Sequence, residues 1–305
     1  MMPMRLGWAL PILTLTLILA LLTLLLEREK LRGGEVAAKA VACYYLTDVQ
    51  LSKLAGRKFK VLVVEFEGLN RESVEELKRH GEVVLGYVNF GYAEEWRSYW
   101  PRVRGEEWIH GATGYTGEFF VEYWDPRWHE VVLEEVEKAC EMGFNGVFFD
   151  NIDACVVVGE EGLEWAAGLN LTELMVDSIA RVSELAREEC GAGFKVYVNI
   201  GSALELLTDS RFLSSIDGVL REEAWYTVGD GRSIMVAEDE TALVIEYLTR
   251  AGHAGKVVVV ADFLDSKELA EEFCSKCWEH GFIPVPQPVW ASDYSRPPPP
   301  GWCDP

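Results

Sequence analysis

The chain has 305 residues and a formal net charge of −22, and 49% of its residues are hydrophobic and 26% are charged. This hydrophobic content, with 11 tryptophans, suffices for a full-sized core and excludes disorder over most of the length. The strong negative charge argues against nucleic acid as a partner, because two polyanions repel each other.

The first predicted element is a membrane-spanning helix at residues 6–26. The stretch has no charged residue, and its 21 residues at about 1.5 Å each cover the roughly 30 Å hydrocarbon core of a bilayer. It ends in three leucines, 24–26, followed by charges, which favours an uncleaved anchor over a cleaved signal peptide. Arg5 before the span predicts, through the positive-inside rule, a body outside the cytoplasm, either anchored or, if the segment is cleaved, secreted. Residues 1–35 are therefore the predicted anchor and linker.

Eight strand-like apolar runs follow, and helical patterns separate several of them. The runs span 41–46, 59–68, 82–91, 146–153, 195–201, 217–226, 256–263 and 282–288. The helical patterns span 70–81, 125–143, 171–191, 239–252 and 266–281. Continuously apolar strands that alternate with helices indicate a parallel sheet covered on both faces.

Eight such units in about 250 residues predict an α/β fold of the (β/α)8 TIM-barrel class. An open doubly wound sheet is the alternative, but no predicted strand is followed by a GxGxxG-type phosphate loop. We therefore place the barrel at residues 36–290 and expect no cofactor. Residues 291–305, with their run of prolines, are predicted to form an extended tail.

An insertion between the third and fourth runs, at about residues 93–126, contains a short additional strand at 118–124. It also holds four tryptophans, Trp96, Trp100, Trp108 and Trp124. Tryptophans at this density either pack beneath a long loop or form a platform for sugars, and both interpretations stay open.

Seven cysteines form no regular framework, and the one CxxC, Cys274 to Cys277, lies inside the helical pattern 266–281. A zinc site would need a second pair or histidines at ligand spacing. Structural cysteines are therefore predicted there, and an odd total leaves at least one cysteine unpaired.

Acids, amides and aromatic residues gather at the predicted C-terminal ends of the strands, where a barrel carries its active site. They are Tyr44, Tyr45, Glu65, Glu67, Tyr87, Asn89, Asp150, Asp153, Asn199, Glu222, Glu223, Asp262 and Gln287. Aromatic faces stack on sugar rings, amides and carboxylates bind hydroxyls, and two carboxylates can cleave a glycosidic bond. Without a Gly-rich cradle or a basic cluster, phosphate chemistry is not expected, and no metal is predicted because no histidine joins Asp150 and Asp153.

Four ordered stretches, 84–101, 124–130, 143–153 and 217–226, resemble glycoside hydrolase family 114. The resemblance runs from about Ala42 to Gln287. It implies a (β/α)8 fold and an extracellular glycosidase, with endo-α-1,4-polygalactosaminidase as the type activity. It also implies a catalytic Asp at the end of the fourth strand and a Glu at the end of the sixth, which fall on Asp150 and Glu222.

The sequence departs from the family pattern at two places. The acid that usually follows the glycine after the third strand is replaced by Tyr92. The doublet of Glu222 and Glu223 also leaves two candidates for one position. Because side chains alternate along a strand, only one of them can face the barrel mouth, and the spacing to Tyr226 favours Glu222.

The resulting hypothesis is an externally facing, membrane-anchored glycoside hydrolase that acts on an amino-sugar polysaccharide, for which a cationic galactosaminan would suit the acidic surface. Its predicted substrate-binding residues are Tyr44, Tyr45, Glu65, Tyr87, Asn89, Trp124, Asp153, Asn199, Tyr226, Asp262 and Gln287. One alternative is a carbohydrate-binding barrel without turnover that uses Trp96, Trp100, Trp124 and Tyr45. The other is a metal-dependent polysaccharide deacetylase or hydrolase that uses Asp150 and Asp153. The roles of acid and nucleophile, and the stereochemical outcome, stay open.

Overall fold

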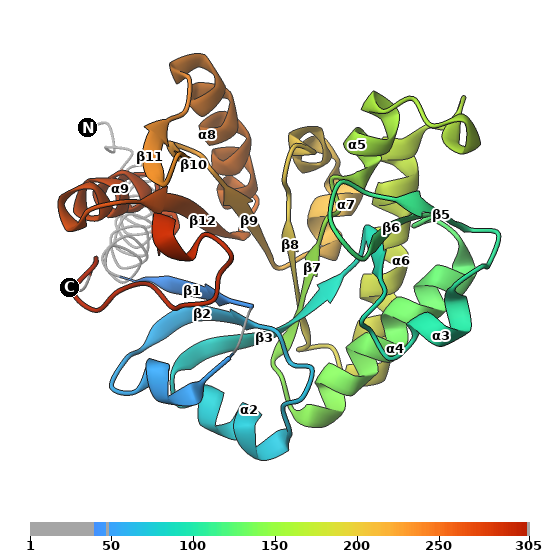
Figure 1. Cartoon of the computed structure of the whole chain (residues 1–305), viewed down its shortest axis with the longest axis horizontal. Helices are drawn as coiled ribbons and strands as arrows, with labels where there is room; N and C mark the ends of the chain where they lie inside the picture. The colour runs from blue at the N-terminus through green and yellow to red at the C-terminus, as the bar shows by residue number, and fades with distance from the viewer. Residues whose placement is uncertain (1–39, 47–48, 304–305) are drawn as a thin grey trace, which may run out of the picture.

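The computed structural model describes residues 40–46 and 49–303, and its central element is a sheet of eight parallel strands. In sheet order the strands are β1 (Ala42–Tyr45), β2 (Phe59–Val64), β3 (Gly81–Asn89), β7 (Gly146–Asp150), β8 (Lys195–Asn199), β9 (Gly218–Glu222), β12 (Val257–Leu264) and β13 (Ile283–Pro288). The order follows the chain without the reversal of a doubly wound sheet, and β1 lies beside β13. The sheet is thus a nearly closed (β/α)8 barrel, with a strand at each of the eight predicted runs (Figure 1).

The predicted membrane-spanning segment, residues 6–26, lies outside the described residues. Within the part of the chain that the structure covers, none of the helices combines the length and the apolar character that a membrane crossing requires.

Helices surround the barrel. They are α2 (Arg71–Leu77), α3 (Trp100–Val103), α4 (Pro126–Met142), α5 (Ala154–Glu160), α6 (Leu171–Cys190), α7 (Ser210–Ser215), α8 (Glu238–His253) and α9 (Lys267–Glu279), with 3-10 turns η1 (Leu51–Leu54), η2 (Glu164–Ala166), η3 (Leu204–Thr208) and η4 (Val289–Ala291). The predicted boundaries of α4 are confirmed, because the Asp125 carboxylate accepts the Arg127 backbone N–H and Gly143 ends the helix at φ 95°.

Two apolar cores lie on the two faces of the sheet. The inner one fills the barrel with residues such as Tyr44, Tyr87, Phe148, Tyr197 and Leu220. The outer one packs between sheet and helices and contains their sequence neighbours, Tyr45, Val88, Phe149, Val198 and Val219. This alternation decides which side chain at each strand end faces the barrel mouth, here meaning the C-terminal edge of the sheet.

The barrel seam between β1 and β13 has a cause in the sequence. Alternate residues of a strand direct their N–H groups to the same neighbour, and in β13 three alternate residues, Pro284, Pro286 and Pro288, have no N–H. The backbone of β13 pairs with β12, to which only its other residues can donate an N–H. The three prolines therefore leave the edge of β13 that faces β1 without N–H donors for a regular ladder.

Two small antiparallel sheets lie outside the barrel sheet, on opposite sides in Figure 1. The insertion forms β4 (Tyr92–Glu94), β5 (Ile109–Ala112) and β6 (Glu118–Val121), which confirms the additional strand. The hairpin of β10 (Tyr226–Gly229) and β11 (Arg232–Met235) follows β9. Among the insertion tryptophans, Trp108 is buried, Trp100 stacks on Phe119 at 4.6 Å, and Trp96 is 51% exposed.

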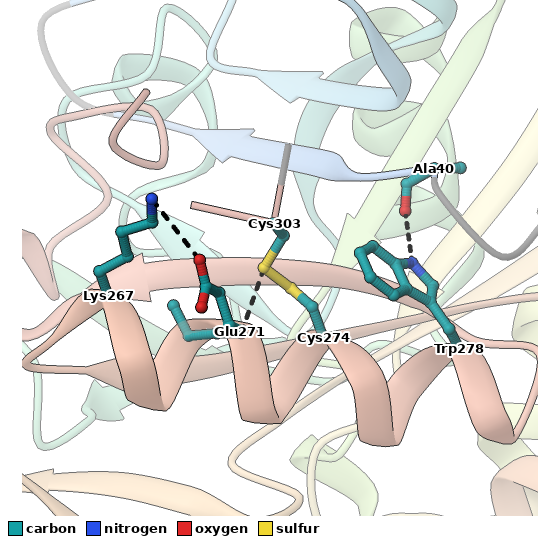
Figure 2. Close-up of a disulfide and its surroundings, with 7 residues drawn as sticks. Ala40, Lys267, Glu271, Cys274, Trp278 and Cys303 are labelled. Atoms are coloured by element: carbon teal, nitrogen blue, oxygen red, sulfur yellow. Dashed lines mark hydrogen bonds and ion pairs between the residues drawn. A yellow bond between two sulfur atoms is a disulfide. The ribbon is translucent and has the colours of Figure 1, made fainter. Parts of the chain in front are cut away.

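The C-terminal segment differs from the predicted extended tail. Tyr294, Pro297, Pro298 and Cys303 are buried, and the segment runs beside β1 in Figure 1. Cys303 forms a disulfide with Cys274 of α9, with 5.9 Å between the Cα atoms (Figure 2). One member of the CxxC is therefore structural, as predicted, but its partner lies 29 residues further along the chain.

We expect Cys303→Ser to lower the free energy of unfolding by about 3 kcal/mol, because a crosslink of this span restricts the unfolded chain. Urea denaturation measures the change. Reductant should destabilise the wild type by a similar amount and leave the variant unaffected. If the variant were as stable as the oxidised wild type, the crosslink would carry no stability.

Candidate active site

Asp150 ends β7, two residues after Phe148 of the inner core, and so points into the barrel mouth. The chain turns sharply behind it, because Asn151 has φ 56° and the Asp150 carbonyl accepts the Phe90 N–H at 3.0 Å. Gly91 packs against this turn, and a Cβ atom there would lie 1.9 Å from the Asn151 carbonyl oxygen. The glycine of the motif after the third strand therefore permits the turn that aims Asp150.

One hydrogen-bond network joins Asp150 to Glu222. The Asn199 amide nitrogen donates to Asp150 Oδ1 at 2.9 Å and to Glu222 Oε1 at 2.8 Å. Asp150 Oδ2 accepts the Tyr87 hydroxyl at 2.9 Å and lies 3.4 Å from that of Tyr44. Five strands thus bring five predicted residues together, one residue from each strand, since Tyr44, Tyr87, Asp150, Asn199 and Glu222 all follow the inward-facing alternation.

The two glutamates of the doublet point to different places. Glu222, at the end of β9, bonds to Asn199 and faces the mouth. Glu223, with φ 58°, lies in the turn that leads to β10 and accepts the hydroxyl of Thr227 in that strand at 2.5 Å. The structure therefore places Glu222, rather than Glu223, beside Asp150.

The surroundings of the two carboxyls raise the pKa of both. Burial, followed by the nearby Asp150 charge, raises the pKa of Glu222 to about 7. Burial also raises the pKa of Asp150, while hydrogen bonds from Asn199 and Tyr87 act in the opposite direction. At a pH where one of two such neighbouring carboxyls is protonated and the other is ionised, the first can act as an acid and the second as a nucleophile.

A buried cation lies beside this network. Arg97 bonds through two nitrogens to both oxygens of Glu65, at 3.0 and 2.7 Å, and through Nε to Glu94 at 2.5 Å. Its guanidinium lies 5.8 Å from the centre of the Tyr87 ring. Glu65, predicted to contact sugar, is therefore an ion-pair partner at the edge of the mouth, and Arg97 ties it to the insertion.

The insertion also supplies a carboxyl to this side. Asn89 Nδ2 lies 3.3 Å from Glu94 Oε1 and 3.5 Å from Glu118 Oε1, and its Oδ1 accepts the Tyr92 N–H at 3.0 Å. Burial, then the charges of Glu94 and Asp150, raise the pKa of Glu118 to about 7. Tyr92 itself is buried against Phe120. This chain has Tyr92 where the family usually has an acid. Glu118 supplies a carboxyl on the same side of the mouth.

Three predicted substrate-binding residues face the helices instead of the mouth. Tyr45 belongs to the outer core and its hydroxyl accepts the Gln50 N–H at 2.9 Å. The Tyr226 hydroxyl bonds to Glu272 and Lys276 of α9. Asp262, fully buried with a pKa raised to about 7 by burial, accepts the backbone N–H groups of residues 224–226. Strand alternation puts Tyr45 and Asp262 outside the barrel, and Tyr226 begins β10 beyond the end of β9. Asp262 instead holds the turn that follows Glu222 and Glu223.

The other predicted residues take supporting positions. Asp153 Oδ2 accepts the Ser202 N–H at 3.0 Å, and its charge is a minor contribution to the raised pKa of Asp150. Gln287 faces inward but its amide binds the carbonyls of Ala291 and Arg296. Trp124 stacks on Trp165, which in turn stacks on His110. No group of three or more His, Cys, Asp or Glu side chains among residues 40–46 and 49–303 is placed to hold a metal ion.

Sequence reasoning missed Tyr294, whose hydroxyl donates to Glu222 Oε2 at 2.6 Å. No local signal could have found it, because it lies in the segment interpreted as a tail. Arg97, Glu94 and Glu118 were also missed. The i,i+3 spacing of Glu94 and Arg97 was a usable signal for an ion pair.

Residues 37–291 match the family model described as glycoside-hydrolase family GH114. The chain belongs to glycoside hydrolase family GH114. This membership makes the protein a glycoside hydrolase by class and confirms the resemblance of its motifs. Among curated relatives, an uncharacterized protein of Methanocaldococcus jannaschii is 23% identical over 81% of this chain and 75% of its own length. One of Thermotoga maritima is 26% identical over 73% and 70%.

Solved structures share the fold of this GH114 chain. The glycoside hydrolase domain of PelA from Pseudomonas aeruginosa has a TM-score of 0.66 at 16% identity and covers 84% of this chain and 96% of that one. Aspergillus fumigatus Ega3, solved in complex with galactosamine, has a TM-score of 0.58 at 14% identity, with 82% and 91% covered.

Proposed function

We propose that this GH114 protein cleaves glycosidic bonds in an amino-sugar polysaccharide by a two-carboxylate mechanism. The observation that carries the proposal is the single Asn199 amide that bonds to both Asp150 and Glu222. It brings two carboxyls of different strands to one point of the mouth. Glycosidases need such a pair on either side of the scissile bond.

Asp150 is assigned as the nucleophile and Glu222 as the general acid and base. Asp150 accepts hydrogen bonds from Asn199 and Tyr87, which favour its ionised form, whereas the pKa of Glu222 is raised to about 7. In the first step Asp150 bonds to the anomeric carbon while the bond from that carbon to the leaving oxygen breaks. The leaving oxygen takes the Glu222 proton. Water then replaces Asp150 at that carbon and returns its proton to Glu222.

We expect the reaction to retain the anomeric configuration. Both acceptor oxygens lie within 2.9 Å of one nitrogen, so they are no more than about 6 Å apart. Retaining enzymes have carboxyls roughly 5–5.5 Å apart, while inverting ones need about 6.5–9.5 Å for a water. Proton NMR of the first-formed anomer tests this, and immediate formation of the opposite anomer would reassign Asp150 as a base.

Two observations support an amino-sugar polymer as the substrate. Ega3, which shares the fold, was solved with galactosamine bound. In this chain Glu118 and Glu94 add carboxyls beside the catalytic pair, and the whole chain carries −22. A cationic, partly deacetylated polymer would be attracted to such a field, most strongly at low salt.

The deciding experiment incubates the full-length protein with a panel of polysaccharides that includes α-1,4-galactosaminan and its N-acetylated form. New reducing ends from an amino-sugar polymer are expected, and polymers without amino sugars should give none. Binding without new ends from any polymer would favour the carbohydrate-binding barrel, for which the half-exposed Trp96 offers a surface. Activity that disappears on exhaustive chelation and returns with a metal would favour the metal-dependent alternative.

We expect kcat/KM to fall as pH rises through about 7, because Glu222 must hold its proton to donate it and its pKa is raised to about that value. On the acid side the rate should fall when Asp150 gains a proton. The two limbs belong to the coupled pair. A substrate without titrating amines isolates the enzyme groups, and a rate that stays flat across neutral pH would contradict the assignment of Glu222.

We also propose that the barrel works outside the cytoplasm. The uncharged segment at residues 6–26 and the Cys274–Cys303 disulfide both support this, because structural disulfides persist mainly in oxidising compartments. Cell fractionation followed by protease treatment of intact cells tests it, and a barrel protected from protease in the cytoplasmic fraction would overturn it.

A further inference from the structure

We propose that residues 289–303, here called the strap, are part of the catalytic apparatus, with Tyr294 as a positioning residue for Glu222. The Cys274–Cys303 disulfide fastens the C-terminal end of the strap to α9. The inference rests on the proposed function, in which Glu222 is the acid and base.

The contact of Tyr294 with Glu222 completes the support of that carboxyl. Glu222 Oε1 accepts the Asn199 amide at 2.8 Å, and Oε2 accepts the Tyr294 hydroxyl at 2.6 Å. Each oxygen thus has a donor from a different element, so the plane of the carboxyl is set by two fixed points. A carboxyl held by one donor could still rotate away from the scissile bond.

The Tyr294 side chain is itself rigidly held. Its ring lies 4.3 Å from the Tyr44 ring and 5.8 Å from that of Phe263, centre to centre, and it is 7% exposed. Its φ is 54°, in the left-handed region that non-glycine residues rarely adopt. Such a conformation persists where the surroundings impose it, and it is common at functional sites.

The strap is tied down along its length. The Tyr294 carbonyl accepts the Leu46 N–H at 3.0 Å, and the Gln287 amide holds the carbonyls of Ala291 and Arg296. Arg57 donates to the Pro298 carbonyl, and Cys303 is crosslinked to α9. The strap therefore bridges β1 and β13, at the seam where the prolines of β13 interrupt the ladder.

The match to the GH114 model ends at residue 291, three residues before Tyr294. The hydroxyl that reaches Glu222 is thus supplied from beyond the matched region. A chain cut at the family boundary would keep every strand and lose this contact together with the disulfide.

The test measures the titration of Glu222 directly, by carbon NMR of the full-length protein labelled at the glutamate carboxyls. Glu222→Gln identifies the resonance. A hydroxyl that donates to a carboxylate favours the charged form, so Tyr294→Phe should raise the Glu222 midpoint by about one pH unit. The ring of phenylalanine keeps the packing. Tyr115→Phe, at a tyrosine 72% exposed, is the matched control and should leave the midpoint unchanged.

Cys303→Ser should shift the midpoint in the same direction, because it releases the end of the strap. The alkaline limb of kcat/KM should move upward with the midpoint in both variants. A Glu222 midpoint that is the same in Tyr294→Phe and the wild type would overturn the inference, whether or not the protein is active. A protein that cleaves no polymer but shows the shift would refute the proposed function and leave Tyr294 as the partner of Glu222.

Discussion

Replacing Asp150 with asparagine is expected to lower kcat about a thousand-fold or more, which corresponds to roughly 4 kcal/mol of lost transition-state stabilisation. The amide cannot form the covalent bond to the anomeric carbon, while its size still fits between Tyr87 and Asn199. Polymer binding should therefore remain within a few-fold of the wild type. Single-turnover kinetics and binding by calorimetry measure the two quantities separately.

Asp153→Asn is a suitable control for this variant. Asp153 carries the same carboxyl three residues later, but it bonds to Ser202 outside the Asp150 network. Its replacement should change stability more than kcat. Comparable losses of kcat in both variants would mean that the rate depends on the local fold of the β7 end rather than on the Asp150 carboxyl. Equal dependence on both aspartates, restored by added metal, would instead support the metal-dependent alternative.

The second large effect is expected at Glu222. Glu222→Gln should lower kcat by about 10²–10⁴, the range that general acid catalysis contributes. Glu223→Gln, at the adjacent residue with the same side chain, should keep nearly wild-type activity, because Glu223 accepts the hydroxyl of Thr227 in β10 rather than the Asn199 amide. Reducing-end assays on the same polymer compare the two variants directly.

The leaving group separates the roles of the two carboxyls. A substrate with a good leaving group needs little protonation, so Glu222→Gln should regain much of the first step on an activated aryl glycoside, whereas Asp150→Asn should not. Full activity in Glu222→Gln together with a loss in Glu223→Gln would transfer the acid to Glu223. That outcome would also require a β9 end that differs from the one described.

Several features of this protein were predictable from local sequence. Eight apolar runs separated by helices predicted the barrel, because parallel strands buried on both faces need continuous apolar residues. Asp150, Glu222, Asn199, Tyr44 and Tyr87 were predictable because strand ends in a barrel meet at one rim and the motifs resemble the family. The limits of α4 were also predictable, because the capping residues Asp125 and Gly143 act through local backbone geometry.

Other features depended on contacts between distant parts of the chain. Tyr45 and Asp262 belong to barrel strands as their neighbours do, but the phase of each strand against its helices turns them outward, while Tyr226 lies past the end of β9 in the hairpin. A shift of one residue reverses the face, and the runs alone do not determine that phase. The choice of Glu222 over Glu223 depended in the same way on the left-handed turn at Glu223.

The C-terminal residues show the difference most clearly. A proline-rich stretch has the local sequence of a tail, and nothing near it in the chain signals a function. Its contacts are with three partners that are far away in sequence, namely Glu222, Leu46 and Cys274. Local sequence therefore determined the strands, the helices and the identity of the rim residues, since these follow from backbone preference and apolar patterning. Tertiary structure decided which rim residues meet, because hydrogen bonds and a disulfide between distant segments form only when the barrel is nearly closed.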